Sequence, residues 1–90
     1  MIYHTTEERM LDMRRISIEA CRANGFDVWQ EEADGHTYCG KAASDEFVDV
    51  YPDGSWEYKN DGHPELNTTG TSPVYLRLYF HDPDFYRKYS

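Results

Sequence analysis

The first part of the chain repeats its apolar residues with the spacing of an amphipathic helix. At that spacing one side carries Met10, Met13, Ile16, Ala20 and Ala23, widened by Leu11, Ile18 and Cys21. Thr5 with Glu8 three residues later has the form of a capping box. Asn24 and Gly25 form a strong stop, because both tolerate the left-handed backbone that ends many helices. The pattern therefore predicts one helix between Thr5 and Gly25.

Beyond Gly25 the period changes to the alternation that is typical of strands. It predicts strands at 26–32, 36–41, 46–51, 55–59 and 74–80. The last is the most regular, because one side carries only large apolar residues: Val74, Leu76, Leu78 and Phe80. Its other side presents Tyr75, Arg77 and Tyr79. A short C-terminal helical turn is expected after Asp82, because Pro83 suits a first helical position.

The turns between these strands predict two hairpins in tandem. Each has an Asp-Gly turn three residues long, at 33–35 and at 52–54, which suits a type I turn closed by a left-handed glycine. A Tyr51–Ser55 pair would place Val48, Val50, Trp56 and Tyr58 on the core side, and Asp49 opposite Glu57 on the outer side. We therefore expect a single compact α+β domain over 1–90, with the N-terminal helix packed on an antiparallel meander of about five strands.

Composition supports a folded domain with a small core. The chain has 90 residues, of which 16% are aromatic, and a domain of this size buries only roughly 60–65% of its unfolded surface. Two cysteines, Cys21 and Cys39, are too few for a disulfide scaffold, and the sequence leaves open whether they are bridged. No membrane-spanning run or signal peptide is present, so we expect a cytoplasmic protein.

Charge is the strongest functional signal in the sequence. Between Asp27 and Glu65 there are eleven acids and two bases, a net charge of −9, whereas the two ends together carry six acids and seven bases. An acidic surface repels nucleic acid and anionic lipid and attracts basic proteins. Direct nucleic-acid binding and membrane binding are therefore disfavoured, and a basic protein surface is the expected partner.

The acids of the hairpins are the candidate partner-binding residues. Glu31, Glu32 and Asp34 lie at the first tip and Asp53 at the second, so one end of the sheet becomes strongly negative if both turns lie there. Spaced carboxylates on a sheet can resemble DNA phosphates, so such a surface could block a nucleic-acid-binding site of another protein. The alternative is that the acids only keep a small protein in solution.

The Asp49–Glu57 pair allows three interpretations. Like charges opposite each other destabilise a ladder, so the pair could serve a cation or basic partner, or acid–base catalysis. It could also consist of two acids that water solvates. No catalytic residue, cofactor or metal is assigned, since the serines and cysteines lack an activating context and no phosphate-binding glycine loop occurs. His36 and Cys39 are spaced so that a strand would send them to opposite faces.

Three functional hypotheses follow. The first is a small acidic regulator or inhibitor that docks on a basic surface, as phage-type inhibitors of nucleic-acid machinery do, an analogy of charge and size only. Trp29, Tyr51, Tyr75 and Tyr79 are its candidate aromatic contacts. The second is a structural or assembly subunit, which includes a homodimer, that associates through Tyr75, Arg77 and Tyr79. The third is a small enzyme that uses Asp49 and Glu57.

Overall fold

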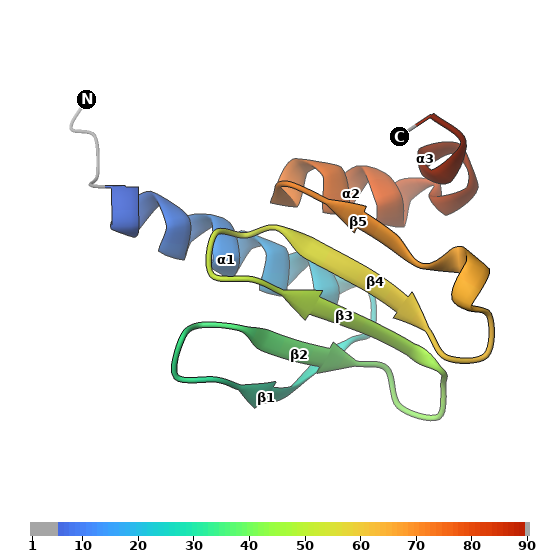
Figure 1. Ribbon diagram of the computed structural model, residues 1–90, viewed down its shortest axis with the longest axis horizontal. Helices are drawn as coiled ribbons and strands as arrows, with labels where there is room; N and C mark the ends of the chain where they lie inside the picture. Colours follow the sequence, from blue (N-terminus) through green and yellow to red (C-terminus); the bar gives the residue numbers. More distant parts are fainter. Residues whose placement is uncertain (1–5, 90) are drawn as a thin grey trace.

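The structure, a computed structural model, describes residues 6–89. Its elements in chain order are α1 (Thr6–Ala23), β1 (Asp27–Glu31), β2 (Thr37–Gly40), β3 (Glu46–Val50), β4 (Trp56–Asn60), the 3-10 turn η1 (Pro64–Leu66), β5 (Thr68–Gly70), α2 (Pro73–His81) and α3 (Pro83–Tyr89). The strands form one antiparallel sheet in the order β1-β2-β3-β4-β5, and α1 and α2 lie behind it in Figure 1. The predicted α+β class and the meander are confirmed.

The core lies between the sheet and the helices. Alternate residues of the central strands β3 and β4 are almost fully buried there: Val48, Val50, Trp56 and Tyr58. Ile18 and Cys21 of α1 cover part of this surface, and Leu76 and Tyr79 of α2 are buried in the same cluster. Each fully buried large apolar side chain contributes roughly 1.5–3 kcal/mol to folding. The opposite side of the sheet has no helix on it in the described part of the chain.

Both hairpin turns have the predicted geometry. In the second, the Tyr51 N–H donates to the Ser55 carbonyl at 2.8 Å, and Asp49 lies opposite Glu57 as expected. Gly35 and Gly54 close the two turns with φ of +96° and +88°. The turns also lie at the same end of the sheet, because a Cβ placed on Gly35 would be only 3.4 Å from the ring of Pro52.

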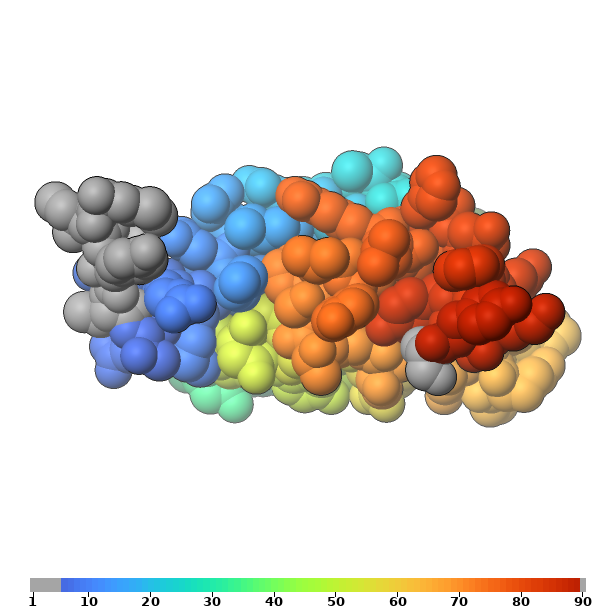
Figure 2. Space-filling model, turned by 90° about the horizontal axis from the view of Figure 1, so that it is seen from above, coloured from blue at the N-terminus to red at the C-terminus, as the bar shows by residue number. Residues whose placement is uncertain are grey.

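The helix α1 differs from its predicted pattern in which residues are buried. Its buried residues are Ser17, Ile18, Ala20 and Cys21. Met10 and Leu11 were expected on the apolar stripe, but they are 37% and 58% exposed. The reason is that the first turns of α1 project past the hairpins, as Figures 1 and 2 both show, so no strand of the described chain covers them there. Thr5 of the expected capping box lies outside the described residues.

The predicted strand at 74–80 is wrong, because the segment forms α2. Its alternation also satisfies helical spacing: Pro73, Leu76 and Tyr79 recur every three residues, and all three are buried. Pro73 stands at the start of the helix, where its fixed φ and missing N–H cost nothing. The fifth strand is instead 68–70, which lies outside every predicted strand. The expected C-terminal turn is confirmed as α3, with Asp82 Oδ1 accepting from the Phe85 N–H at 3.1 Å.

The C-terminal helix α3 covers the outer edge of β5. The Tyr86 hydroxyl donates to the Thr69 carbonyl at 3.1 Å, which occupies an edge group that another strand could otherwise pair with. Arg87 donates to the Leu66 carbonyl at 3.0 Å and to the Tyr79 hydroxyl at 2.6 Å. These contacts fix α3 against the sheet and α2.

The second hairpin turn packs directly on α1, which leads to a stability prediction. A Cβ on Gly54 would lie 2.6 Å from Met13 Cβ and 2.7 Å from the Met13 carbonyl carbon, so the helix backbone would have to move. We expect Gly54→Ala to lower the free energy of unfolding by about 3 kcal/mol or more, through left-handed strain plus overpacking. Urea unfolding followed by circular dichroism measures this loss.

Gly35→Ala is the matched control for this prediction. Gly35 has the same left-handed backbone conformation as Gly54, but a Cβ added to it would lie 3.4 Å from the Pro52 ring, an ordinary van der Waals distance. Its loss should be about 1–2 kcal/mol, from left-handed strain alone. Equal losses in the two variants would show that the contact between the second turn and α1 adds nothing.

Candidate functional site on the bare face of the sheet

The side of the sheet that faces away from the helices is the candidate site. We call it the bare face, and strand pairing assigns to it Asp27, Trp29, Gln30, Tyr38, Gly40, Phe47, Asp49, Glu57, Lys59 and Thr69. Figure 1 looks onto this face. It differs from the core face in carrying charged side chains, among them Asp49, Glu57 and Lys59. A sheet face without a covering layer is a surface on which another molecule can pack.

A β-bulge determines where Trp29 lies. The register of β1 against β2 shifts between Val28 and Gln30, so Trp29 is the extra residue. Its ring lies over Gly40, where an added Cβ would be 2.5 Å from ring carbons, and it meets the Phe47 ring edge-on at 5.5 Å. Trp29 remains 55% exposed. The bulge and the missing side chain at Gly40 together place an indole flat on the sheet with much of its surface open to solvent.

A shallow hollow of about 260 Å³ adjoins this tryptophan. Its lining is mixed, with aromatic, acidic and basic side chains: Trp29, Tyr38, Cys39, Phe47, Asp49, Lys59 and Asp61. Asp61 is exposed at the rim, whereas Asp49 is only 5% exposed. An open aromatic ring near carboxylates is a favourable environment for a cationic side chain, which gains both cation–π and ionic contacts.

The Asp49–Glu57 pair is joined by a lysine that the sequence analysis did not consider. Lys59 Nζ is 2.8 Å from Asp49 Oδ2 and 3.5 Å from Glu57 Oε1. The hydrogen bond to Asp49 raises the pKa of Lys59, and both carboxylates add to the effect. The interpretation of two acids solvated by water is therefore wrong for Asp49, which is buried and ion-paired. Glu57 does not line the hollow, so the two carboxylates do not share that cavity.

A stack of rings closes one side of this ion-paired cluster. His36 lies between Tyr38 and Tyr51, with ring centroids 4.2 Å and 4.6 Å away. His36 Nε2 is buried without a hydrogen bond and lies 4.0 Å from Asp49 Oδ2. The Tyr51 hydroxyl donates to Glu57 at 3.3 Å. The pKa of Tyr51 is raised mainly by burial and, to a smaller extent, by the negative charge of Glu57. Tyr51 is thus half-buried in the cluster.

The hairpin acids do not all keep a free charge. Glu31 pairs with Arg14 of α1 at 3.3 Å, so it lies on the helix side of the sheet and its charge is compensated. Glu32, Asp34 and Asp53, which we call the hairpin-tip acids, are exposed, and within residues 6–89 no cation pairs with them. Two hydrogen bonds from Ser55 lower the pKa of Asp53, so this charge persists into acidic solution.

The predicted surface row of Tyr75, Arg77 and Tyr79 is wrong. A strand would place these three side chains on one face, but the segment is the helix α2, which points them in different directions. Tyr79 is 3% exposed and belongs to the core, where burial raises its pKa. Tyr75 is 45% exposed and lines a cleft beside α3, while Arg77 is exposed on a different side of α2. Of these three residues, Tyr75 alone is an exposed aromatic contact.

The fold separates charge between its two layers. The strands with their connections (24–72, the sheet layer) carry eleven acids and two bases, a net charge of −9. The helices (6–23 and 73–89, the helix layer) carry six acids and seven bases, a net charge of +1. Because the helices lie on one side of the sheet, the acid-rich part of the chain and the near-neutral part form two separate layers of the molecule.

The side chains of the two cysteines belong to the core side of the sheet. Cys21 and Cys39 are both buried and free, and a hydrogen bond between them together with burial raises the pKa of Cys21. Cys39 of β2 therefore faces α1. His36, three residues before Cys39, lies on the other side of the sheet in the stack with Tyr38 and Tyr51. Among the residues described, no three His, Cys, Asp or Glu side chains are grouped to hold a metal.

Comparison with known proteins returns no match: neither a family model, nor a curated protein, nor a solved structure resembles the chain. Within residues 6–89 no helix has the length and apolar character needed to cross a membrane.

The burial of Asp49 predicts that Lys59 matters more than an ordinary surface lysine. We expect Lys59→Met to lower the free energy of unfolding by about 2 kcal/mol at neutral pH, because it leaves Asp49 buried without its cation and opposite Glu57. In the wild type, the raised pKa of Lys59 means that its contribution is present below the ordinary lysine pKa and disappears as the pH rises through the folded value.

Lys41→Met is the control, since Lys41 has similar exposure but pairs at 3.7 Å with the more exposed Glu46. We expect it to cost about 0.5 kcal/mol or less, as is usual for surface pairs. Thermal and urea unfolding across pH measures both variants. The assignment fails if the two substitutions have equal effects at neutral pH.

Proposed function

We propose that this chain is a small protein-binding regulator of the inhibitor type, whose sheet layer docks on a basic surface of another protein. The observation that carries the proposal is the separation of charge, with −9 in the sheet layer and +1 in the helix layer. A field with one sign on one side orients a basic partner before contact and raises the rate of association.

The docking surface consists of the bare face and the hairpin-tip acids beside it. The hairpin-tip acids are exposed and carry charges that no described cation compensates, so they contribute long-range attraction. Trp29, on the bare face, supplies exposed apolar area. Protein interfaces concentrate their binding energy in such aromatic residues. Lys59 keeps the cluster around Asp49 from repelling itself, so the face is rigid before a partner arrives.

The class of partner follows from the same charges. Carboxylates spaced along a sheet can take positions that resemble those of nucleic-acid phosphates, which favours a partner whose basic groove normally holds nucleic acid. Such a partner would be blocked by occupation of that groove. The interpretation remains an analogy with small acidic phage inhibitors at the level of charge and size.

Neutralising the hairpin-tip acids tests the role of charge. The variant Glu32→Gln/Asp34→Asn/Asp53→Asn removes three charges but keeps side-chain oxygens that can accept the turn hydrogen bonds of Asp34 and Asp53. We expect its affinity for the partner to fall roughly tenfold at low salt and its salt dependence to become shallower. The partner is first captured from the source cells at low salt, identified by mass spectrometry, purified and titrated by calorimetry.

A helix-layer variant with the same change in net charge is the control. Glu7→Gln/Asp12→Asn/Asp84→Asn also removes three exposed acids, but from the opposite layer. Its affinity should stay close to that of the wild type. Equal losses in the two variants would mean that net charge, and not a docking surface, governs binding. Competition by double-stranded DNA tests whether the partner's site is one that holds nucleic acid.

Trp29 provides a second, independent test of the bare face. We expect Trp29→Ala to weaken binding on the order of thirtyfold, because hot-spot aromatics contribute about 2 kcal/mol or more, while the salt dependence stays unchanged. Trp29→Phe retains a ring over Gly40 and should recover much of the affinity. Calorimetry on correctly folded variants measures both. Wild-type affinity in Trp29→Ala would remove the bare face from the interface.

A further inference from the structure

A second surface of the molecule is apolar, and it lies on the helix layer. The described residues include eight large hydrophobic side chains that are exposed, and five of these lie on α2 and α3: Val74, Tyr75, Leu78, Phe85 and Tyr89. Figure 2 shows the two helices side by side on this side of the molecule. Single exposed apolar residues are ordinary, but a contiguous group on a small domain marks an interaction site.

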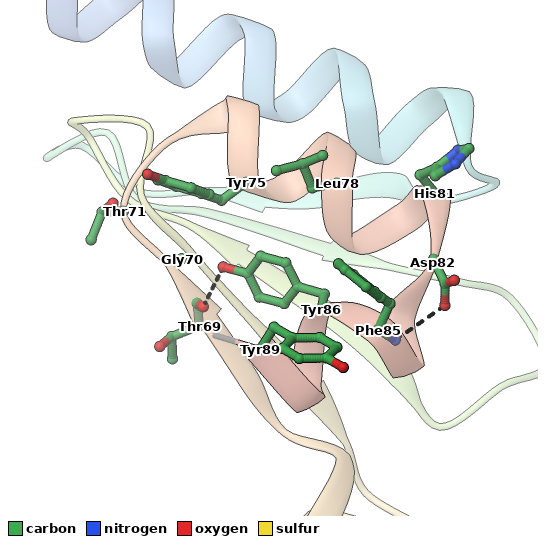
Figure 3. Close-up of a pocket in the computed structure, with 10 residues that line it drawn as sticks. All are labelled: Thr69, Gly70, Thr71, Tyr75, Leu78, His81, Asp82, Phe85, Tyr86 and Tyr89. Atoms are coloured by element: carbon green, nitrogen blue, oxygen red, sulfur yellow. Dashed lines mark hydrogen bonds between the residues drawn. The ribbon is translucent and has the colours of Figure 1, made fainter.

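Four of these five side chains, all except Val74, line a cleft of about 540 Å³, which we call the aromatic cleft. Its lining comes from β5 and the residue after it, from α2 and from α3: Thr69, Gly70, Thr71, Tyr75, Leu78, His81, Asp82, Phe85, Tyr86 and Tyr89. In Figure 3 the side chains of α2 lie along one wall and the rings of α3 face them. Asp82 is the one acid among the lining residues.

The aromatic cleft is held in shape before anything binds. The Tyr86 hydroxyl is fixed on the Thr69 carbonyl at 3.1 Å, and the Phe85 and Tyr89 rings contact each other with centroids 4.6 Å apart. Asp82 accepts from the Phe85 N–H, which fixes the junction between α2 and α3. A rigid apolar hollow therefore lies beside projecting apolar side chains, of which Val74 is 59% exposed.

Charge identifies the occupant of the aromatic cleft. Two copies of the chain repel each other through their sheet layers, each of which carries −9, but not through their helix layers, which carry +1. The helix layer also contains both the hollow and the projecting side chains that a two-fold interface needs, since each copy must offer both to the other. A basic partner would be drawn to the opposite side of the molecule.

We propose that two copies of this chain associate through the aromatic cleft into a two-fold dimer, with Leu78 of each copy in the interface. The two sheet layers then face outward on opposite sides, so the dimer presents two negative surfaces. This inference rests on the aromatic cleft and on the charges of the two layers, and it stands whether or not a basic partner exists. The dimer would also cover Tyr75, an exposed aromatic residue that lines the cleft.

Sedimentation velocity from micromolar to millimolar protein tests the dimer. The wild type should shift from monomer to dimer mass as concentration rises, and added salt should preserve or strengthen the dimer because it screens repulsion between the sheet layers. Leu78→Asp should weaken self-association at least tenfold, because it places a carboxylate in the apolar interface. Leu11→Asp is the matched control: Leu11 is a 58% exposed leucine on α1 outside the cleft, against 51% for Leu78.

Each outcome decides the proposal. The proposal is supported if the wild type forms a concentration-dependent dimer, Leu78→Asp abolishes that dimer and Leu11→Asp does not. If Leu78→Asp loses its circular dichroism signal, Phe85→Asp, at a 60% exposed position on α3, replaces it in the same comparison. A wild type that stays monomeric at every concentration overturns the proposal, and so does a dimer that the folded cleft variants leave intact. Binding of an apolar dye to such a monomer would assign the cleft to a small apolar ligand instead.

Discussion

Burial of Trp56 is the interaction on which the rest of the structure depends. Its ring is 1% exposed and lies against Gly70 of β5, where an added Cβ would be 2.4 Å from ring atoms. The indole N–H donates to the Ser72 carbonyl at 2.9 Å, and the rings of Tyr79 and Tyr86 lie 5.6 Å and 5.7 Å away. One side chain of β4 thereby joins β5, α2 and α3, and a large buried aromatic of this kind contributes several kcal/mol, about 3–5 by truncation to alanine.

Because this packing places every helix on one side of the sheet, the molecule has two chemically different sides. The layer formed by the strands and turns carries most of the acids, and on its uncovered face Lys59 makes the close approach of Asp49 and Glu57 tolerable. The apolar residues that the small core cannot enclose remain on α2 and α3. A domain of this size cannot bury all of its aromatics, and the fold gathers Tyr75, Phe85 and Tyr89 at the aromatic cleft while Trp29 lies exposed on the bare face.

The register of the second hairpin could be predicted because it depends on local rules. The Asp-Gly turn length fixes the Tyr51–Ser55 pair, and a register slip would turn Val48 and Trp56 outward. The segment 74–80 could not be predicted in the same way. An apolar run this short satisfies both strand and helix spacing, and the decision came from the fit of Leu76 and Tyr79 against the core.

The sequence by itself determined the first helix, the meander, the turn geometry and the excess of acids in its middle, because each follows from the spacing of near neighbours. The tertiary structure alone decided that Glu31 meets Arg14, that Lys59 lies between two carboxylates and that Tyr79 is buried while Tyr75 is exposed. Those outcomes depend on which face of each element turns toward the others. That choice is made by packing across segments far apart in the chain, which no local pattern records.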